Sequence, residues 1–225
     1  MNEPGWTHRV PRARGSVAAA AAWDSAPWRD VPPLTMGHHM GEPPAHRPLA
    51  QVKLQYDAEA VHLIFRVEDR WVRCRVAEYQ GDVCTDSCVE FFFTPGPDLA
   101  DGYFNLEASC GGTLLFTHRQ GGDEEVVDMP EQEARCIEVA HTLPSLLEAE
   151  ITTPVTWEVS YHIPLQVLRA YARVTAPGPG TSWRANFYKC ADASSHPHWL
   201  TWAPVDWPHP DFHRKEFFGT LEFGE

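Results

Sequence analysis

From residue 51 onward, short segments of the chain place an apolar side chain at every second position. Residues 52–56 and 61–67 both follow this pattern, and the turn Asp57-Ala58-Glu59 separates them. A period of two is that of a β-strand with one buried face. Two such segments joined by three residues predict a β-hairpin.

Further short apolar or alternating segments follow, most of them bounded by turn residues. They cover residues 71–76, 88–94, 103–109, 113–118, 135–141, 156–163, 183–190 and 217–223. Pro164–Tyr171 differs, because it begins with proline and has apolar residues at helical spacing, which predicts one short helix. About nine or ten strands at this spacing predict an all-β fold, an antiparallel β-sandwich of two sheets with a jelly-roll or immunoglobulin-like arrangement.

Residues 1–50 carry eight prolines and show no strand periodicity. Because proline interrupts helices and central strands, this part predicts an irregular N-terminal segment that packs on the sandwich. At 225 residues, the chain has the length of a single all-β domain with long loops. We therefore expect an irregular segment over residues 1–50 and a sandwich over residues 51–225.

The charge balance restricts the class of partner. Against 18 Lys and Arg residues stand 31 Asp and Glu residues, a formal net charge of -13. Such a surface repels phosphate backbones and anionic lipids, so neither nucleic acid nor a membrane is expected as a partner. The N-terminus lacks a basic region followed by a long apolar stretch, so we expect a soluble, cytoplasmic protein, with export by another route left open.

Six cysteines are spread along the chain: Cys74, Cys84, Cys88, Cys110, Cys136 and Cys190. An even count in a chain without an export signal does not establish disulfides, so free buried thiols are expected. The spacing of Cys84 and Cys88 matches no common zinc knuckle.

Three groups of motifs, in order along the chain, define a family resemblance. They are Val67-Glu68-Asp69 with Asp86-Ser87-Cys88-Val89-Glu90-Phe91-Phe92, then Gly102-Tyr103-Phe104-Asn105-Leu106-Glu107, then a C-terminal set formed by residues 183–189, 199, 202–204, 212–213 and 218–223. Each motif is weak alone, but the ordered set resembles the family 9 carbohydrate-binding modules and the wider DOMON-like sandwich group. The resemblance covers the chain from about residue 51 to its end.

This resemblance implies a sandwich that binds mono- or oligosaccharides between tryptophans, in a cleft formed by loops at one end. It implies no catalytic cofactor, although some members contain structural calcium. The chain departs from the family at Cys84, where many members carry tryptophan just before the Asp-Ser motif.

The chemistry of sugar binding selects the candidate residues. A sugar ring presents an apolar C–H face and a rim of hydroxyls, so its site needs flat aromatic rings and polar groups. The aromatic candidates are Trp71, Trp199, Trp202 and Trp207, and the polar candidates are Glu90, Asn105, Glu107, Asn186 and Tyr188. The alternative for each ring is core packing, and for each polar side chain an internal hydrogen-bond network.

Other functions remain open. Glu90 and Glu107 have the residue types of a glycosidase acid and base. One loop contains residues of zinc-ligand type: His196, His198, His209, Asp211 and His213. Exposed loop histidines are the favoured alternative for this set. Residues of haem-ligand type lie close together at Met36, His38, His39 and Met40, but adjacent residues cannot approach opposite faces of one haem. A structural or interaction domain with a lost sugar site is the last alternative, suggested by Cys84.

Overall fold

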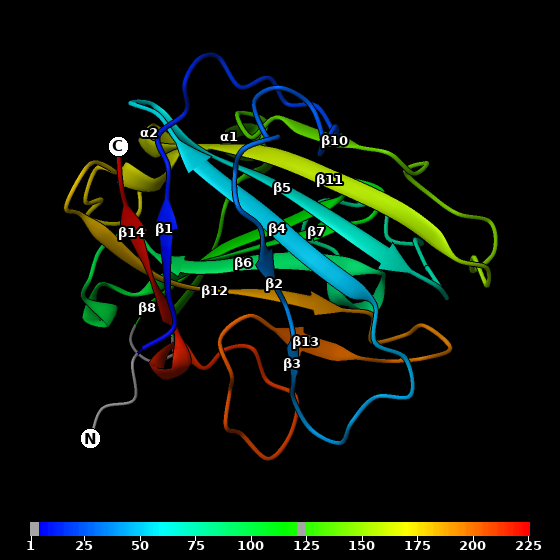
Figure 1. Cartoon of the computed structure of the whole chain (residues 1–225). Coiled ribbons are helices and arrows are strands. Elements are labelled where there is room, and N and C mark those ends of the chain that lie inside the picture. The colour runs from blue at the N-terminus through cyan, green and yellow to red at the C-terminus, as the bar shows by residue number, and fades with distance from the viewer. Residues whose placement is uncertain (1–4, 121–124) are drawn as a thin grey trace.

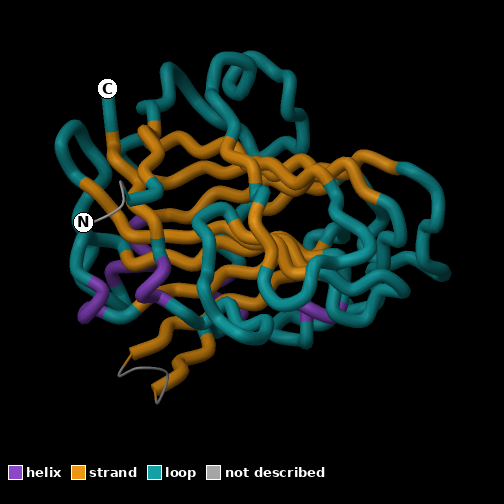
Figure 2. Tube along the Cα trace, turned by 60° about the horizontal axis from the view of Figure 1, so that its bottom comes forward, coloured by secondary structure: helices purple, strands orange, loops and turns teal. Residues whose placement is uncertain are grey.

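In the computed structural model, residues 5–120 and 125–225 are described, and within them two β-sheets pack face to face (Figure 1). The first sheet consists of β1 (Thr7–Val10), β3 (His38–His39), β6 (Cys88–Thr94), β7 (Tyr103–Ser109), β8 (Leu114–Gln120), β9 (Glu125–Asp128), β12 (Ser182–Cys190), β13 (Trp199–Thr201) and β14 (Gly219–Phe223). Its order is β1-β14-β12-β6-β7-β8-β9, with β13 pairing both β12 and β3. Figure 2 shows the hairpin of β8 and β9 projecting from the rest of the molecule.

The second sheet has five strands in the order β10-β11-β5-β4-β2. They are β2 (Leu34–Thr35), β4 (Leu49–Tyr56), β5 (Ala60–Asp69), β10 (Val139–His141) and β11 (Val155–Pro164). The helices are short: α1 (Glu131–Ala134), α2 (Leu165–Arg169) and the 3-10 turns η1 (Val83–Thr85), η2 (Leu99–Asp101) and η4 (Lys215–Phe217). This architecture confirms the all-β, two-sheet prediction and the short helix at 165–169. In the described parts of the chain, no helix has the length and hydropathy of a membrane span.

The alternating segments form the central strands because their apolar faces meet between the sheets. Phe91 and Phe187, on the neighbouring strands β6 and β12, stack with ring centroids 4.9 Å apart. Phe65 of the opposite sheet approaches Phe187 at 6.3 Å. Burial of one such ring stabilises the fold by roughly 1.5–3 kcal/mol.

The N-terminal segment departs from the prediction in part. It contributes the strands β1, β2 and β3, and β1 pairs with β14 in parallel, so the first sheet is not purely antiparallel. Residues 17–31 cover part of the outer face of the second sheet, where Trp23 and Trp28 are buried. The Lys53 ammonium donates to the carbonyl oxygens of both tryptophans, which ties the segment to β4.

The predicted strand at 71–76 does not form. Val72 makes an isolated bridge to Ile151. The backbone N–H groups of Arg75 and Val76 donate to the Asp86 carboxylate at 2.7 and 2.8 Å, so they are not free for a strand ladder. A side chain that satisfies backbone donors competes with sheet formation.

Candidate functional site

A hollow of about 240 Å³ lies on the outer face of the first sheet, between the strands and the loop of residues 210–213. It is lined by Cys84, Glu90, Phe92, Glu107, Cys190, Asp192, Trp199, Pro210, Asp211, Phe212 and His213. We call this hollow the acidic pocket. It contains three of the nine predicted site residues: Glu90, Glu107 and Trp199.

Strand register builds the floor of the acidic pocket. Glu90 on β6 lies opposite Glu107 on β7 and opposite Tyr188 on β12. Cys88, two residues before Glu90, lies opposite Cys190. Since side chains two residues apart on a strand share a face, these groups all project outward, away from the core between the sheets.

Burial raises the pKa values of the two carboxyl groups on the floor of the pocket. Glu90 is 2% exposed, and burial, then the charge of Glu107, raises its pKa well above the usual range. Burial, followed by the charge of Asp192, raises the pKa of Glu107 to about 7. A protonated carboxyl group donates as well as accepts hydrogen bonds, so the floor offers both to a ligand.

Aromatic rings form the walls of the acidic pocket. Trp199 on β13 is half-buried, and its indole Nε1 donates to Asp192 Oδ1 at 2.8 Å, which fixes the ring plane. Phe212 stacks on Tyr188 with centroids 4.1 Å apart and planes at 12°. The pocket therefore combines flat apolar surface with polar groups on its floor.

Three predicted polar residues do not line the pocket and form internal hydrogen bonds instead. Asn105 Nδ2 donates to Glu107 Oε1 at 2.9 Å, and the Tyr188 hydroxyl donates to the Phe212 carbonyl at 3.2 Å. Asn186 bonds the backbone of Ala203 through both its amide atoms, at 3.0 and 2.9 Å. All three are almost fully buried, which corresponds to the internal-network alternative for these positions.

The other tryptophans lie outside the acidic pocket. Trp202 is 3% exposed and packs in the core, so it has no free face for a sugar. Trp71 stacks on His196 at 3.6 Å, and the Arg214 guanidinium lies 3.6 Å from the ring centroid of Trp207. Neither ring lines the pocket.

Sequence reasoning missed several lining residues. Cys190 lies two residues after Tyr188, at the end of β12, and Asp192 lies two residues beyond Cys190. Because side chains two residues apart on a strand share a face, this spacing from Tyr188 could have indicated both residues. Phe212 comes from a loop whose path has no periodic signal, and Asp211 and His213 of the same loop were considered only as zinc-ligand types.

The histidine and methionine sets do not assemble into ligand clusters. His198 is buried, with Nε2 2.7 Å from the Lys189 ammonium, whereas His213 lies 2.9 Å from the Tyr103 hydroxyl. His38 and His39 form β3, with Met36 and Met40 buried on either side of it. Within the described residues, the one group of three or more metal-ligand side chains is Cys88, Glu90 and Cys190.

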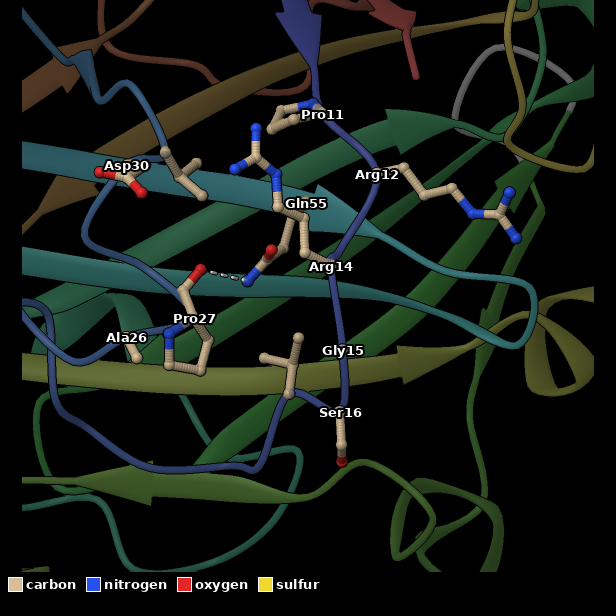
Figure 3. A pocket seen from close by; sticks show the side chains of 11 residues that line it. Pro11, Arg12, Arg14, Gly15, Ser16, Ala26, Pro27, Asp30 and Gln55 are labelled. Carbon is tan, nitrogen blue, oxygen red and sulfur yellow. Dashed lines mark hydrogen bonds between the residues drawn. The ribbon is translucent and has the colours of Figure 1, made fainter.

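A second hollow, of about 290 Å³, lies beneath the N-terminal segment (Figure 3). Its lining includes Arg12, Arg14, Asp30 and Gln55, and Gln55 Nε2 donates to the Pro27 carbonyl at 3.2 Å. The lining has no aromatic ring and no paired buried carboxyl groups. The acidic pocket is therefore the stronger candidate.

The fold and the acidic pocket define a β-sandwich with a small pocket on one outer face. Residues 38–223 match the model of carbohydrate-binding family 9. Since this match covers most of the chain, the protein belongs to carbohydrate-binding family 9. No curated protein matches the chain at a significant level.

Solved structures agree with this assignment. A candidate carbohydrate-binding protein from Bacteroides uniformis ATCC 8492 is similar with a TM-score of 0.86 and 25% identity, over 97% of this chain and 99% of that one. A family 9 module from Caldicellulosiruptor kristjanssonii, in complex with glucose, is similar with a TM-score of 0.63 and 13% identity, over 96% of this chain and 95% of that one. A structure of a family 9 module from the same organism, in complex with cellotriose, is similar with a TM-score of 0.62 and 13% identity, over 96% of this chain and 93% of that one. At 13% identity, the likeness concerns the fold.

Proposed function

We propose that the protein binds a neutral carbohydrate in the acidic pocket without changing it chemically. The observation that carries this proposal is the pair of buried carboxyl groups of Glu90 and Glu107 on the floor, beside the half-buried ring of Trp199. A pocket of about 240 Å³ is many times the roughly 10–15 Å³ of such volume that one water needs, so it can admit a small polar ligand such as a sugar ring. Family membership and the sugars bound by the Caldicellulosiruptor module support it.

Charge selects the class of sugar. Glu107 Oε2 is buried and has no hydrogen-bond partner among the described residues, so a ligand hydroxyl that donates to it removes a desolvation cost. Asp192 and Asp211 add further carboxylates at the rim. A negative surface repels uronic acids and sugar phosphates, so the favoured ligands are uncharged sugars.

The placement of the carboxyl groups favours binding over hydrolysis. A glycosidase needs two carboxyl groups on opposite sides of the scissile bond. Glu90 and Glu107 stand on neighbouring strands at the same register and project in one direction. Both therefore approach a bound sugar from the same side.

Calorimetric titration with glucose, cellobiose and other neutral mono- and disaccharides tests the proposal. Trp199→Ala is expected to weaken binding about tenfold, equal to about 1.4 kcal/mol, because the stacking surface is lost. Trp6→Ala is the matched control, since Trp6 is 44% exposed and does not line the pocket. Equal losses in both variants, or chromatography showing sugar cleavage by the wild type, would contradict non-catalytic binding at this site.

Cys84→Trp tests the wall where this chain departs from its family. Cys84 is half-buried and lines the pocket. A ring at this position adds a stacking contact of about 0.5–1.5 kcal/mol, so tighter binding is expected. If neither the wild type nor Cys84→Trp binds any sugar of the panel, the domain has a structural or interaction role instead.

A further inference from the structure

Two thiols and a carboxyl group converge beneath the acidic pocket. The sulfurs of Cys88 and Cys190 and a carboxylate oxygen of Glu90 all lie within 4.8 Å of one another. The Cys190 thiol donates to Glu90 Oε1 at 3.0 Å. None of the three side chains is more than 2% exposed.

The sheet holds these three groups in place. Cys88 and Cys190 are register partners on β6 and β12, and Glu90 is two residues along β6 on the same face. Positions on paired central strands keep their spacing better than positions on loops, so the cluster is preorganised.

A further buried acid lies in the same pocket, next to the cluster. Glu107 Oε2, in the same pocket, is buried and lacks a hydrogen-bond partner among the described residues. The neighbouring cation, Lys189, projects to the other face of β12, where its ammonium lies 3.6 Å from Asp69 Oδ2 and bonds His198. Among the described residues, no lysine or arginine lines the acidic pocket, although the charge of Arg119 acts on Glu107 and lowers its pKa.

We propose that Cys88, Cys190 and Glu90 bind a thiophilic divalent metal ion of the Zn²⁺ class. Zinc–sulfur bonds of about 2.3 Å in a tetrahedron place two sulfurs about 3.8 Å apart, a separation compatible with the spacing of these ligands. Two thiolates and one carboxylate fill three positions. Glu90 and Cys190 line the acidic pocket, so a water or a ligand hydroxyl from the pocket would complete the tetrahedron.

Metal binding at this cluster releases protons from the three ligand side chains. Burial raises the pKa of Cys88 to about 12 and raises the pKa values of Cys190 and Glu90 well above their usual ranges, so burial favours the protonated form of each group. The metal ion displaces two thiol protons and one carboxyl proton, which pass to solvent, and no redox partner is needed. Metal affinity therefore rises with pH.

Titration of the reduced protein with Co²⁺ tests the site, because thiolate coordination produces charge-transfer absorption in the near ultraviolet. The background carries Cys136→Ser, which removes the exposed thiol. We expect saturation at a single equivalent, displacement by Zn²⁺, and loss of the signal in Cys88→Ser and in Cys190→Ser.

Cys110→Ser is the matched control. Cys74 and Cys110 are neighbouring buried thiols that form no ligand cluster with a carboxylate among the described residues. This variant is expected to keep the signal. If the cysteine variants at the site fail to fold, Glu90→Gln provides the test, and a weaker signal with unchanged near-ultraviolet circular dichroism is expected.

The metal proposal fails if the folded, reduced wild type gives no thiolate–Co²⁺ absorption, or if Cys88→Ser and Cys190→Ser leave it unchanged. Sugar titration in the presence of a chelator separates this failure from that of the proposed function. Sugar binding without metal leaves the carbohydrate proposal intact whatever the Co²⁺ result.

Discussion

Replacement of Glu107 by glutamine should change how the stability of the protein depends on pH. The Glu107 carboxyl group is buried beside Asp192 and Glu90, and its pKa rises from 4.5 to about 7 in the folded protein. Glutamine has nearly the same shape and accepts the same hydrogen bond from Asn105, but it does not ionise. The substitution therefore removes one buried titration and leaves the packing nearly unchanged.

The sign and size of the effect follow from proton linkage. Between pH 4.5 and about 7 the folded state holds the proton on Glu107 and the unfolded state has lost it. Stability from this group is therefore complete below pH 4.5 and is lost as the pH rises through about 7. The difference between the two pKa values, at about 1.4 kcal/mol per unit, gives an upper value of about 3.5 kcal/mol.

Urea denaturation followed by tryptophan fluorescence measures this effect at about pH 4 and about pH 8, values chosen on either side of the linkage window. The loss of unfolding free energy between them should be smaller in Glu107→Gln than in the wild type, by up to about 3.5 kcal/mol. Glu216→Gln, at an exposed glutamate, is the matched control and should keep the wild-type dependence. Identical pH dependence in the wild type and Glu107→Gln would refute the assigned burial of this acid.

Two further predictions concern the scaffold. Lys189→Met should lower the unfolding free energy by about 3–5 kcal/mol in urea denaturation, because it leaves the buried Asp69 carboxylate without its cation; an unchanged midpoint would contradict this. Gly111→Ala should cost about 1–3 kcal/mol, since its Cβ would lie 2.4 Å from the Ser145 carbonyl oxygen. Gly178→Ala is the control, since nothing lies within 4 Å of its Cβ. Thermal melts of both variants measure the effect, and the melting temperature of Gly178→Ala should be close to that of the wild type.

Alternation and short apolar runs predicted most of the central sheet. The segment Cys88–Thr94 forms β6 at the predicted bounds, because both of its faces are covered and it contains the continuous run Phe91-Phe92-Phe93. The short strands β1, β2 and β3 could not be predicted. They have two to four residues each, and only pairing partners distant in the sequence stabilise them.

The tryptophans show where sequence reasoning lost accuracy. Trp199 and Trp202 were both candidates, although residues an odd number apart on an extended segment point to opposite faces. In the structure Trp199 faces the acidic pocket and Trp202 faces the core. The ring of Trp202 fits there because Gly219 has no side chain: a Cβ on that residue would lie 2.7 Å from it. Such a close approach depends on tertiary packing and leaves no local sequence signal.

The two proposals depend on a single register, that of β6 between β12 and β7. Phe91 points inward to the core and Glu90 points outward to the pocket, so a shift of one residue would bury the acid among phenylalanines and expose an aromatic ring. The phenylalanines therefore fix the position of the polar face as well as the core. Cys88, Glu90 and Cys190 lie together because hydrophobic packing on the other side of the same strands holds the register, and the chemistry of the outer face follows from it.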